Sequence, residues 1–521
     1  MNRLFLYSGL LFILILIFDA YDRDYNMPQV EMVESQEYVN PKASGQPPAE
    51  NASDSPASDT TLNRQKRVEI LESNKLLIKF DELTGEILFS ELKDYSKDLG
   101  SDQNIIILDY ENKKYTAKSS IQIYDTLSQP SYVKQSIVGT NKVILEALNI
   151  PGINITKTIE VLNDSHQLVI TNKVENKTTS SIKIRNYETI SRDNNSTASV
   201  MLPTYTGSAF YDEENKFSKL SFEDIFENKQ IIKTKDSWIS MIEHYFFSAW
   251  LPTSSDQKTI YTNFENDIYT IGSATNYQTI DVGQSIVFKS LMFVGPKLQS
   301  EITSLTNGLD LTVDYGVLTF LSAPLFWILD SINYIFDNWG LSIIILTILI
   351  KAIFFKLSES SYRSMAQMKK LNPRMQALKE RYAEDKKKFS EALMRMYKEE
   401  KVNPLGGCLP ILIQIPVFIA LYWVLVESIE IRHAPFFGWI QDLSSADPYF
   451  ILPIAMGASM YIQQKLNPAP TDPTQQKIFM FLPFIFTALF ATFPSGLVLY
   501  WLTNNVLSIA QQYVINKRIV G

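Results

Sequence analysis

The residue with the clearest chemical consequence is Lys351, a cation inside the mostly apolar segment 341–357. It lies 12 residues after Trp339, which is about 18 Å at 1.5 Å per residue of α-helix. A cation at the centre of a bilayer costs about 2.5–3.5 kcal/mol unless it meets water or a partner. We therefore expect Lys351 either to reach toward the aqueous phase beside Lys356 or to face a hydrated hollow, where it could pair with a carboxylate.

Other polar side chains lie at comparable depth in the apolar segments. They are Thr347, Gln414 and Asn504. Each alone is typical of a hydrogen bond between helices, but together with Lys351 they indicate a polar cavity. The aromatic side chains of Phe418, Tyr500 and Trp501 could form an apolar wall beside it, although such residues usually pack or face lipid.

Motifs for covalent chemistry are missing from the sequence. The single cysteine, Cys408, excludes a disulfide framework and a cysteine-rich zinc site, and the three histidines are far apart. There is no glycine-rich phosphate-binding motif and no G-x-S-x-G motif. A Ser–Lys hydrolase built on Lys351 lacks a convincing serine. We expect no catalytic residue, no metal and no cofactor.

Five apolar segments within residues 338–518 predict an α-helical bundle in a membrane. They are 341–357, 405–426, 451–466, 478–493 and 497–515. Two of them have about 16 residues, fewer than the ~20 that span a typical bilayer, which predicts local thinning of the membrane. Residues 1–19 predict an N-terminal signal anchor, and hence six transmembrane helices. Residues 315–337 alternate apolar and polar positions and predict an amphipathic helix in the membrane interface.

The first half of the chain has a different composition. Residues 20–61 are rich in Pro, Ser and Asp and poor in large apolar side chains, which predicts a disordered linker. Residues 62–310 contain short β-rich runs separated by turn clusters, which predicts a large all-β sandwich domain. Representative runs are 76–80, 105–110, 153–161, 168–174 and 286–294.

The distribution of charge predicts the side of the membrane that each part occupies. Residues 19–340 contain 28 Lys+Arg and 44 Asp+Glu, whereas residues 356–401 contain 13 and 7. Cytoplasmic loops of membrane proteins carry an excess of Lys and Arg. We therefore expect both termini and residues 356–401 in the cytoplasm and the β domain on the opposite side, the periplasm of a bacterium with an outer membrane.

Residues 358–403 show apolar side chains at helical spacing, which predicts two antiparallel helices, a cytoplasmic helical hairpin. Five methionines lie in it, namely Met365, Met368, Met375, Met394 and Met396. They form either the seam between the two helices or an adaptable apolar surface for varied hydrophobic segments. The basic faces of the hairpin could meet anionic lipid or ribosomal RNA.

Several motifs resemble the YidC-type membrane protein insertases, which are related to the mitochondrial Oxa and chloroplast Alb proteins. Residues 403–418, NPLGGCLPILIQIPVF, are similar to the third span of that family, and residues 493–501, FPSGLVLYW, are similar to its last span. The resemblance covers residues 314–518 closely. The preceding parts resemble the Gram-negative form of the family, whose periplasmic domain is a β-supersandwich.

The resemblance implies an insertase and chaperone that places nascent helices into the bacterial inner membrane, alone or with the Sec translocon. It implies a hydrophilic groove in which Lys351 occupies a position that is usually Arg, so that the charge is kept but the planar fork is lost. The other groove or substrate-contact positions that it implies are Thr347, Gln414, Phe418, Tyr500 and Trp501. Expected partners are nascent membrane proteins, the Sec translocon, membrane lipid, and the ribosome or signal-recognition machinery.

Two other classes of protein remain open at this point. A solute transporter or channel is permitted by six spans with buried polar residues, although the spans show no inverted repeat. A carbohydrate-binding β domain with a membrane anchor would leave the later apolar segments and the hairpin unexplained.

Overall fold

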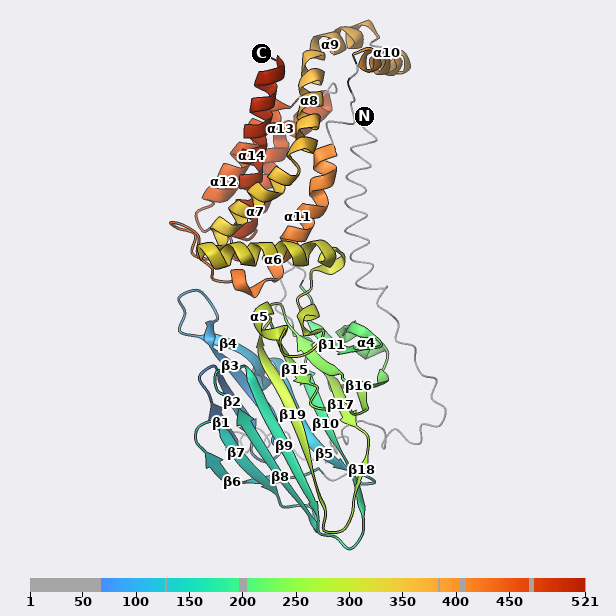
Figure 1. Ribbon diagram of the computed structural model, residues 1–521, viewed down its shortest axis with the longest axis vertical. Coiled ribbons are helices and arrows are strands. Elements are labelled where there is room, and N and C mark those ends of the chain that lie inside the picture. The colour runs from blue at the N-terminus through green and yellow to red at the C-terminus, as the bar shows by residue number, and fades with distance from the viewer. Residues whose placement is uncertain are drawn as a thin grey trace. The chain divides into compact units, whose positions relative to one another are not determined.

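Figure 1 shows a computed structural model of the chain, coloured from the N-terminus to the C-terminus. It describes residues 67–126, 129–195, 204–382, 385–400, 402, 409–467 and 473–520. The described residues form two compact units, one that ends at Val313 and one that begins at Asp314. The anchor predicted at 1–19 and the linker predicted at 20–61 lie outside the described residues.

The unit Ala20–Val313 is an all-β sandwich, as predicted, and every pairing between its described strands is antiparallel. The first sheet consists of β1 (Val68–Glu72), β2 (Leu76–Asp81), β3 (Ile87–Ser96), β4 (Asn104–Asp109), β5 (Thr116–Ile123), β10 (Ile182–Arg192), β13 (Ile231–Thr234), β16 (Lys258–Glu265), β17 (Ile268–Thr275) and β18 (Gln278–Ile280). The second consists of β6 (Tyr132–Val138), β7 (Lys142–Ala147), β8 (Ile153–Val161), β9 (Gln167–Asn176), β11 (Gly207–Asp212), β12 (Lys216–Leu220), β14 (Trp238–Ile242), β15 (Phe246–Leu251) and β19 (Ser285–Pro296). Short helices in this unit are α3 (Tyr110–Lys113), α4 (Phe222–Glu227), α5 (Gln299–Ile302) and η2 (Leu309–Thr312).

Alternating side chains build the core between the two sheets. Along β8 every second residue is buried, which is the period of a strand with one face in the core. One residue of this buried row is Lys157, whose Nζ donates to the backbone oxygen of Ser119 (2.7 Å) on the opposite sheet. Burial lowers the pKa of Lys157 to about 7, because the surroundings disfavour the charged form. The two sheets are therefore joined by polar as well as apolar contacts.

A second buried polar group, His166, connects both sheets to α5. Its Nε2 lies 3.2 Å from Oδ1 of Asp94 on β3, and its Nδ1 lies 3.1 Å from Oε2 of Glu301 on α5. The imidazole is only 1% exposed. Burial alone would lower the pKa of His166, but the hydrogen bonds and charges of the two carboxylates outweigh it and raise that pKa above 6.5. A protonated imidazole, with two donors, satisfies both carboxylates at once.

The other unit is helical. Its elements are η3 (Gly316–Leu318), α6 (Thr319–Phe336), α7 (Trp339–Ile353), α8 (Phe355–Lys370), α9 (Asn372–Arg381), α10 (Lys386–Glu399), α11 (Leu409–Glu427), η4 (Ile429–Ile431), α12 (Ile451–Leu466), α13 (Pro473–Phe490) and α14 (Ser495–Val520). α14 contacts α7, α8, α11 and α12 and so lies at the centre of the bundle. α6 lies across one end of the bundle rather than along it (Figure 1).

The lengths of these helices do not by themselves establish the number of membrane spans. Among the described helices, Gly316–Phe336 is the one continuous helix that is long and apolar enough to cross a membrane, and the bent pair of α7 and α8 would be a second. α12 has only 16 residues and is too short for that criterion. Six spans therefore stay a prediction.

The apolar segment 341–357, predicted as one span, is divided between two helices. α7 stops at Ile353, and α8 begins at Phe355 with its axis turned by 69°. Gln511 of α14 donates from Nε2 to the backbone oxygen of Phe355 (3.2 Å), so a side chain of a neighbouring helix binds the backbone at the break. An apolar run in the sequence carries no signal for such a contact.

The methionines at 365–396 lie mostly where α8, α9 and α10 pack against one another. Met368, Met375 and Met396 are buried in a cluster with Leu371, Tyr397 and Val402, and Met365 packs against it. Met394 is 49% exposed. The burial of these three methionines favours the seam over the adaptable apolar surface, because their helical spacing places them between the helices.

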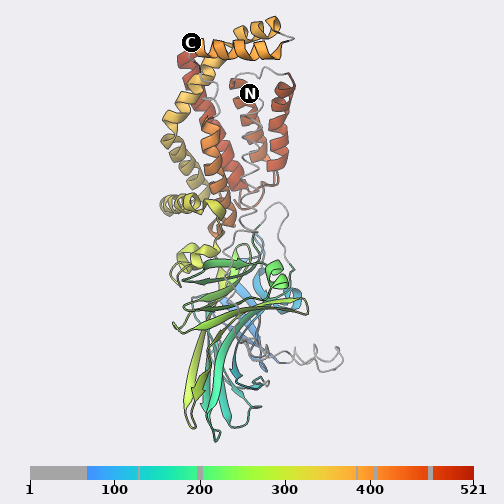
Figure 2. The same ribbon diagram turned by 90° about the vertical axis from the view of Figure 1, so that its right-hand side faces the viewer.

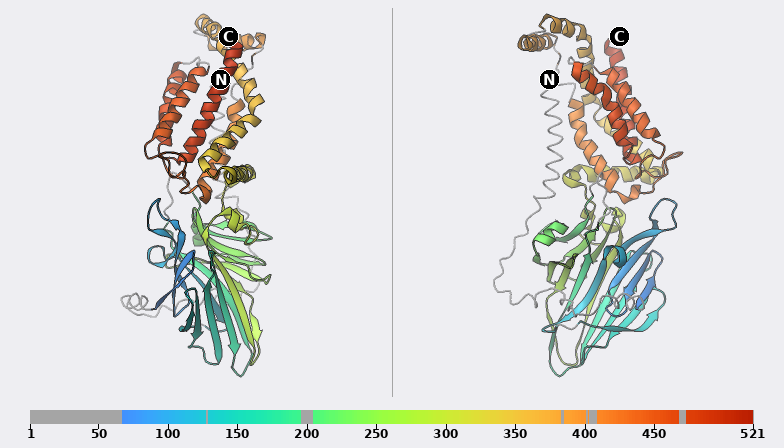
Figure 3. Two further views of the ribbon diagram at one scale, coloured as in Figure 1. Left: turned by 60° about the vertical axis from the view of Figure 1, so that its left-hand side comes forward. Right: turned by 180° about the vertical axis from the view of Figure 1, so that it is seen from behind.

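The pair α12 and α13 is held together by a close contact at Gly457. Both helices can be followed beside α14 in Figure 2 and, from two further sides, in Figure 3. A Cβ atom on Gly457 would lie 1.8 Å from Oγ1 of Thr487, which itself donates to the backbone oxygen of Pro483 (2.7 Å). Glycine at this position lets the two helices approach closely.

We expect Gly457→Ala to destabilise the helical unit by about 1–3 kcal/mol, since Thr487 must rotate and give up its bond to Pro483 or the helices must separate. Thermal denaturation of the full chain in detergent measures the loss. The double variant Gly457→Ala/Thr487→Ala should recover most of it, and a double variant as unstable as the sum of both singles would contradict the contact.

Candidate functional site

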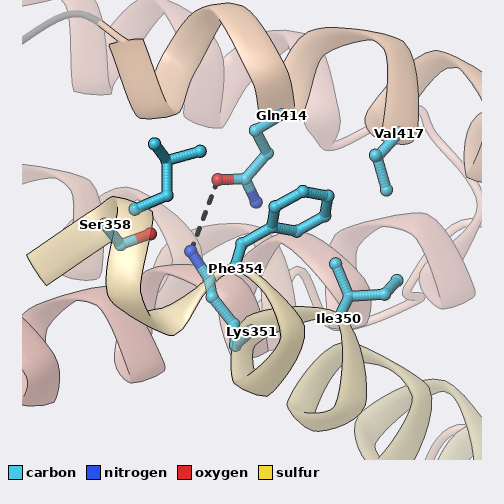
Figure 4. Close-up of a pocket in the computed structure, with 7 residues that line it drawn as sticks. Ile350, Lys351, Phe354, Ser358, Gln414 and Val417 are labelled. Carbon is cyan, nitrogen blue, oxygen red and sulfur yellow. Dashed lines mark hydrogen bonds between the residues drawn. The ribbon is translucent and has the colours of Figure 1, made fainter.

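Lys351 lies in the last turn of α7, and side chains from two other helices hold its ammonium group. Nζ donates to Oγ of Ser508 on α14 (2.8 Å) and to Oε1 of Gln414 on α11 (3.3 Å). Lys351 and Gln414 point toward one another in Figure 4. The cation is thus kept between helices and is partly buried.

Both side chains that accept from Lys351 also form a hydrogen bond with Asn504 of α14. Nε2 of Gln414 donates to Oδ1 of Asn504, and Oγ of Ser508 donates to the backbone oxygen of Asn504 (2.7 Å). The result is a closed ring of hydrogen bonds through three helices. Such bonds between helices fix the positions of polar groups at membrane depth.

A hollow of about 330 Å³, part of it open to the surroundings, lies beside the ammonium group. Its lining comes from α7, α8, the connection between them, and α11, namely Ile350, Lys351, Phe354, Leu357, Ser358, Gln414 and Val417 (Figure 4). Three of the lining side chains are polar, those of Lys351, Ser358 and Gln414, and the other four are apolar. The hollow therefore places apolar surface next to a cation.

Aromatic side chains form a second surface, farther along α11 and α14. The ring of Phe418 meets that of Trp501 edge to face, with centroids 4.6 Å apart, and lies 6.1 Å from that of Tyr500. Trp501 also contacts Phe490 of α13, at 5.1 Å. Offset and edge-to-face pairs of this kind are favourable beyond their buried area. The sequence predicted an aromatic wall beside the polar cluster. In the structure these aromatic rings pack between α11, α13 and α14.

The structure does not bring every predicted residue into the network. Thr347 is 1% exposed, and its Oγ1 donates to the backbone oxygen of Ile343 in its own helix (2.6 Å). Ser508 was missed, although it lies one helical turn after Asn504 and therefore on the same face. Its spacing from Asn504 was the signal that could have identified it.

The ring of hydrogen bonds leaves the charge of Lys351 uncompensated. Both of its acceptors are neutral, and no described carboxylate forms an ion pair with it. An ammonium group has three donors, and the two described contacts use two of them. The third N–H can therefore donate to water, or the ammonium group can form an ion pair with a carboxylate that enters the hollow.

An all-β sandwich together with an apolar helical bundle that holds a partly buried cation is typical of a membrane protein with a large domain outside the bilayer. Comparison with known proteins agrees with this class of protein. The family model "YidC periplasmic domain" matches residues 69–328, and "60Kd inner membrane protein" matches residues 331–521. The chain belongs to the YidC family of membrane protein insertases. The family places it in the inner membrane with the β domain in the periplasm.

Relatives described as membrane protein insertase YidC match almost the whole chain. One from Methylobacillus flagellatus is 40% identical over 535 residues, with 99% of this chain and 97% of the relative covered. One from Haemophilus influenzae is 40% identical over 531 residues with the same coverage. A crystal structure of an active YidC insertase is similar over 86% of this chain and 92% of its own, with 18% identity and a TM-score of 0.39. These relatives give no support to a transporter or channel.

Proposed function

We propose that this insertase receives its substrates in the hollow beside Lys351 and releases them along the aromatic surface into lipid. The observation that carries the proposal is the uncompensated ammonium group, held by Ser508 and Gln414 at the edge of the hollow. The step is one of partitioning: no covalent bond forms or breaks.

The barrier to insertion is the polar flank of a substrate helix. A helix of ~20 apolar residues is stable in lipid, because each Leu or Ile contributes about −0.3 to −0.6 kcal/mol. An acidic residue in its flank costs about 2.5–3.5 kcal/mol at the bilayer centre. A hydrated hollow shortens the path through hydrocarbon, and the charge of Lys351 gives the carboxylate a temporary partner. The apolar part can then move along Phe418 and Trp501 into lipid.

The proposed topology has six spans, with both termini and the hairpin of α8–α10 in the cytoplasm. Its support is the excess of Lys and Arg in residues 356–401, 13 against 7 acidic residues. α6 would lie in the membrane interface, since Phe320, Trp327 and Tyr334 are exposed on one face while Leu325 and Leu329 are buried.

Three kinds of partner accompany the substrates in this proposal. Nascent chains would reach the hollow from the ribosome or signal-recognition machinery, for which the basic hairpin offers a docking surface. The Sec translocon would deliver larger substrates from within the membrane. Lipid would take up the released helix at α11 and α13.

Photo-crosslinking tests the path of the substrate. A photoreactive amino acid at Gln414 or at Trp501 should crosslink to a ribosome-bound, single-span nascent chain. The matched control is Val506, which lies on the same helix α14 near Asn504 but is 51% exposed on its outer face. We expect crosslinking at Val506 to be several-fold weaker. Equal yields at all three positions would contradict a defined path.

A further inference from the structure

Four large aromatic side chains project from the connection between α11 and α12, which the proposed insertion path does not use. We name this group the aromatic tip; it consists of Phe437, Trp439, Tyr449 and Phe450, whose surfaces are 61, 39, 66 and 50% exposed. Large apolar side chains that a folded protein exposes together mark a contact surface.

A buried carboxylate holds the tip in place. Asp447 is 1% exposed, and its Oδ1 accepts from Nε1 of Trp439 (3.0 Å) and from the backbone N–H of Tyr449 (3.0 Å). Its Oδ2 accepts from the backbone N–H of Leu452 (2.7 Å) in the first turn of α12. One side chain thus fixes both the indole and the start of the helix.

The backbone at Phe450 also shows that the exposure is built into the fold. Its φ is +57°, in the left-handed region that bulky residues rarely adopt. The strain is maintained by the turn from Asp447, whose backbone oxygen accepts from the N–H of Phe450 (3.1 Å). The ring of Phe450 consequently remains half exposed at the first residue before α12.

The tip lies at the level where α7 and α12 begin. Nδ2 of Asn338 donates to the backbone oxygen of Phe436 (3.3 Å), and a Cβ atom on Gly340 would lie 2.1 Å from the Phe436 ring. α12 follows the tip directly, and its Ile451 and Ile454 are 44 and 60% exposed. In a membrane, such an exposed apolar helix face contacts lipid. The tip therefore continues a surface that faces lipid.

We infer that the aromatic tip inserts into the headgroup–acyl boundary of the periplasmic leaflet and anchors the start of α12 there. The occupant is a phospholipid surface, because Trp and Tyr favour this boundary and because the apolar face of α12 adjoins it. Trp439 has already given its only donor to Asp447, so its ring can leave water without an unpaired N–H. The hydroxyl of Tyr449 can bond to headgroups.

The anchor has a consequence for the thickness of the bilayer. α12 has 16 residues and is about 24 Å long, against ~30 Å for a typical hydrocarbon core. When its first turn is fixed at one boundary, the missing length is met at the other end of α12, by a thinner bilayer or by Lys465 in the last turn reaching to the headgroups.

Nitroxide labels measure the depth of the tip directly. In the full chain with Cys408→Ser, single labels are placed at Phe437→Cys and Tyr449→Cys, both exposed enough to accept the change. Gln441→Cys is the control on the same connection, since Gln441 is exposed and polar. Ile462→Cys is the control within α12, where the side chain is 50% exposed. Power saturation in phospholipid vesicles compares collisions with oxygen and with a water-soluble nickel chelate.

We expect the oxygen-to-nickel accessibility ratio at 437 and 449 to be at least twofold higher than at 441 and lower than at 462. Ratios equal to that at 441 would overturn the inference, because the tip would then lie in water. Labels protected from both reagents would also overturn it, because a protein surface would then cover the tip. Circular dichroism of each labelled chain verifies folding, so that a failed variant is recognised.

Discussion

Replacing Lys351 by Gln should slow the insertion of a substrate with an acidic flank about tenfold. Gln keeps hydrogen-bonding capacity toward Gln414 and Ser508 but removes the charge, which is not paired with a described carboxylate. A tenfold change corresponds to about 1.4 kcal/mol, well within the ~4 kcal/mol between two charges 4 Å apart at an effective dielectric constant of about 20. Insertion into vesicles that contain the purified chain measures the rate.

The substrate and the variant each have a matched control. A substrate whose flank carries Asn or Gln instead of the acid should insert at nearly the same rate with either chain, because it makes no use of the charge. Lys351→Arg should retain most of the activity, and Lys477→Ala, which removes an exposed lysine of α13, should change little. Equal losses for acidic and neutral flanks would show that Lys351 acts through packing instead.

Ser508 gives a graded version of the same experiment. Ser508→Ala leaves the charge of Lys351 but removes its shorter hydrogen bond, of 2.8 Å. The ammonium then depends on Gln414 alone. We expect an effect on acidic substrates that is smaller than that of Lys351→Gln, and Ser508→Thr, which restores the hydroxyl, should reverse it.

The spacing of apolar residues in this chain specifies the faces of its strands but not which strands pair. The strand predicted at 153–161 is β8, residue for residue, because apolar side chains recur at every second position except that of Lys157. The pairing of β10 with β5, β17 and β18 was not predicted. These partners are far apart in the chain, and the alternation along one strand does not say which strand lies beside it.

The polar cluster was predictable for a related reason. Depth along an apolar segment can be counted, so Lys351, Gln414 and Asn504 could be placed at similar levels before any contact was known. Counting does not give the direction of a hydroxyl group. Thr347 was expected in the groove but bonds to its own helix, whereas Ser508 was overlooked and bonds to Lys351. Serine and threonine in membrane helices can do either.

The stability of the β domain should depend on pH through His166. The pKa of His166 is raised in the folded chain, so its contribution is fully present below pH 6.5 and is lost as pH rises through the folded-state value. Burial alone would raise the pKa of Asp94, but its hydrogen bond and charge interaction with His166 outweigh this and lower it below 3.8. That contribution is therefore present above pH 3.8 and is lost as pH falls through the folded-state value. The stabilising contributions of His166 and Asp94 are therefore present together between about pH 4 and 6.5.

We expect His166→Gln to lower the free energy of unfolding by about 2 kcal/mol in that window and by less as the pH rises further. Removing one partner of a buried ion pair typically costs ~3–5 kcal/mol, and the value is smaller here because Asp94 is 38% exposed. Urea denaturation of the full chain in detergent measures the difference, and hydrogen exchange of residues 299–302 reports whether α5 detaches.

A double-mutant cycle separates the ion pair from simple packing. Glu301→Gln should weaken the domain over the same pH range, and its loss should not add to that of His166→Gln, because both remove the same contact of 3.1 Å. Additive losses, or a difference between wild type and His166→Gln that stays constant from pH 5 to pH 9, would mean that the imidazole is neutral and stabilises the turn by packing. Under the charged arrangement, the coupling between His166 and Glu301 must disappear in alkaline solution, since only the imidazolium can donate to both carboxylates.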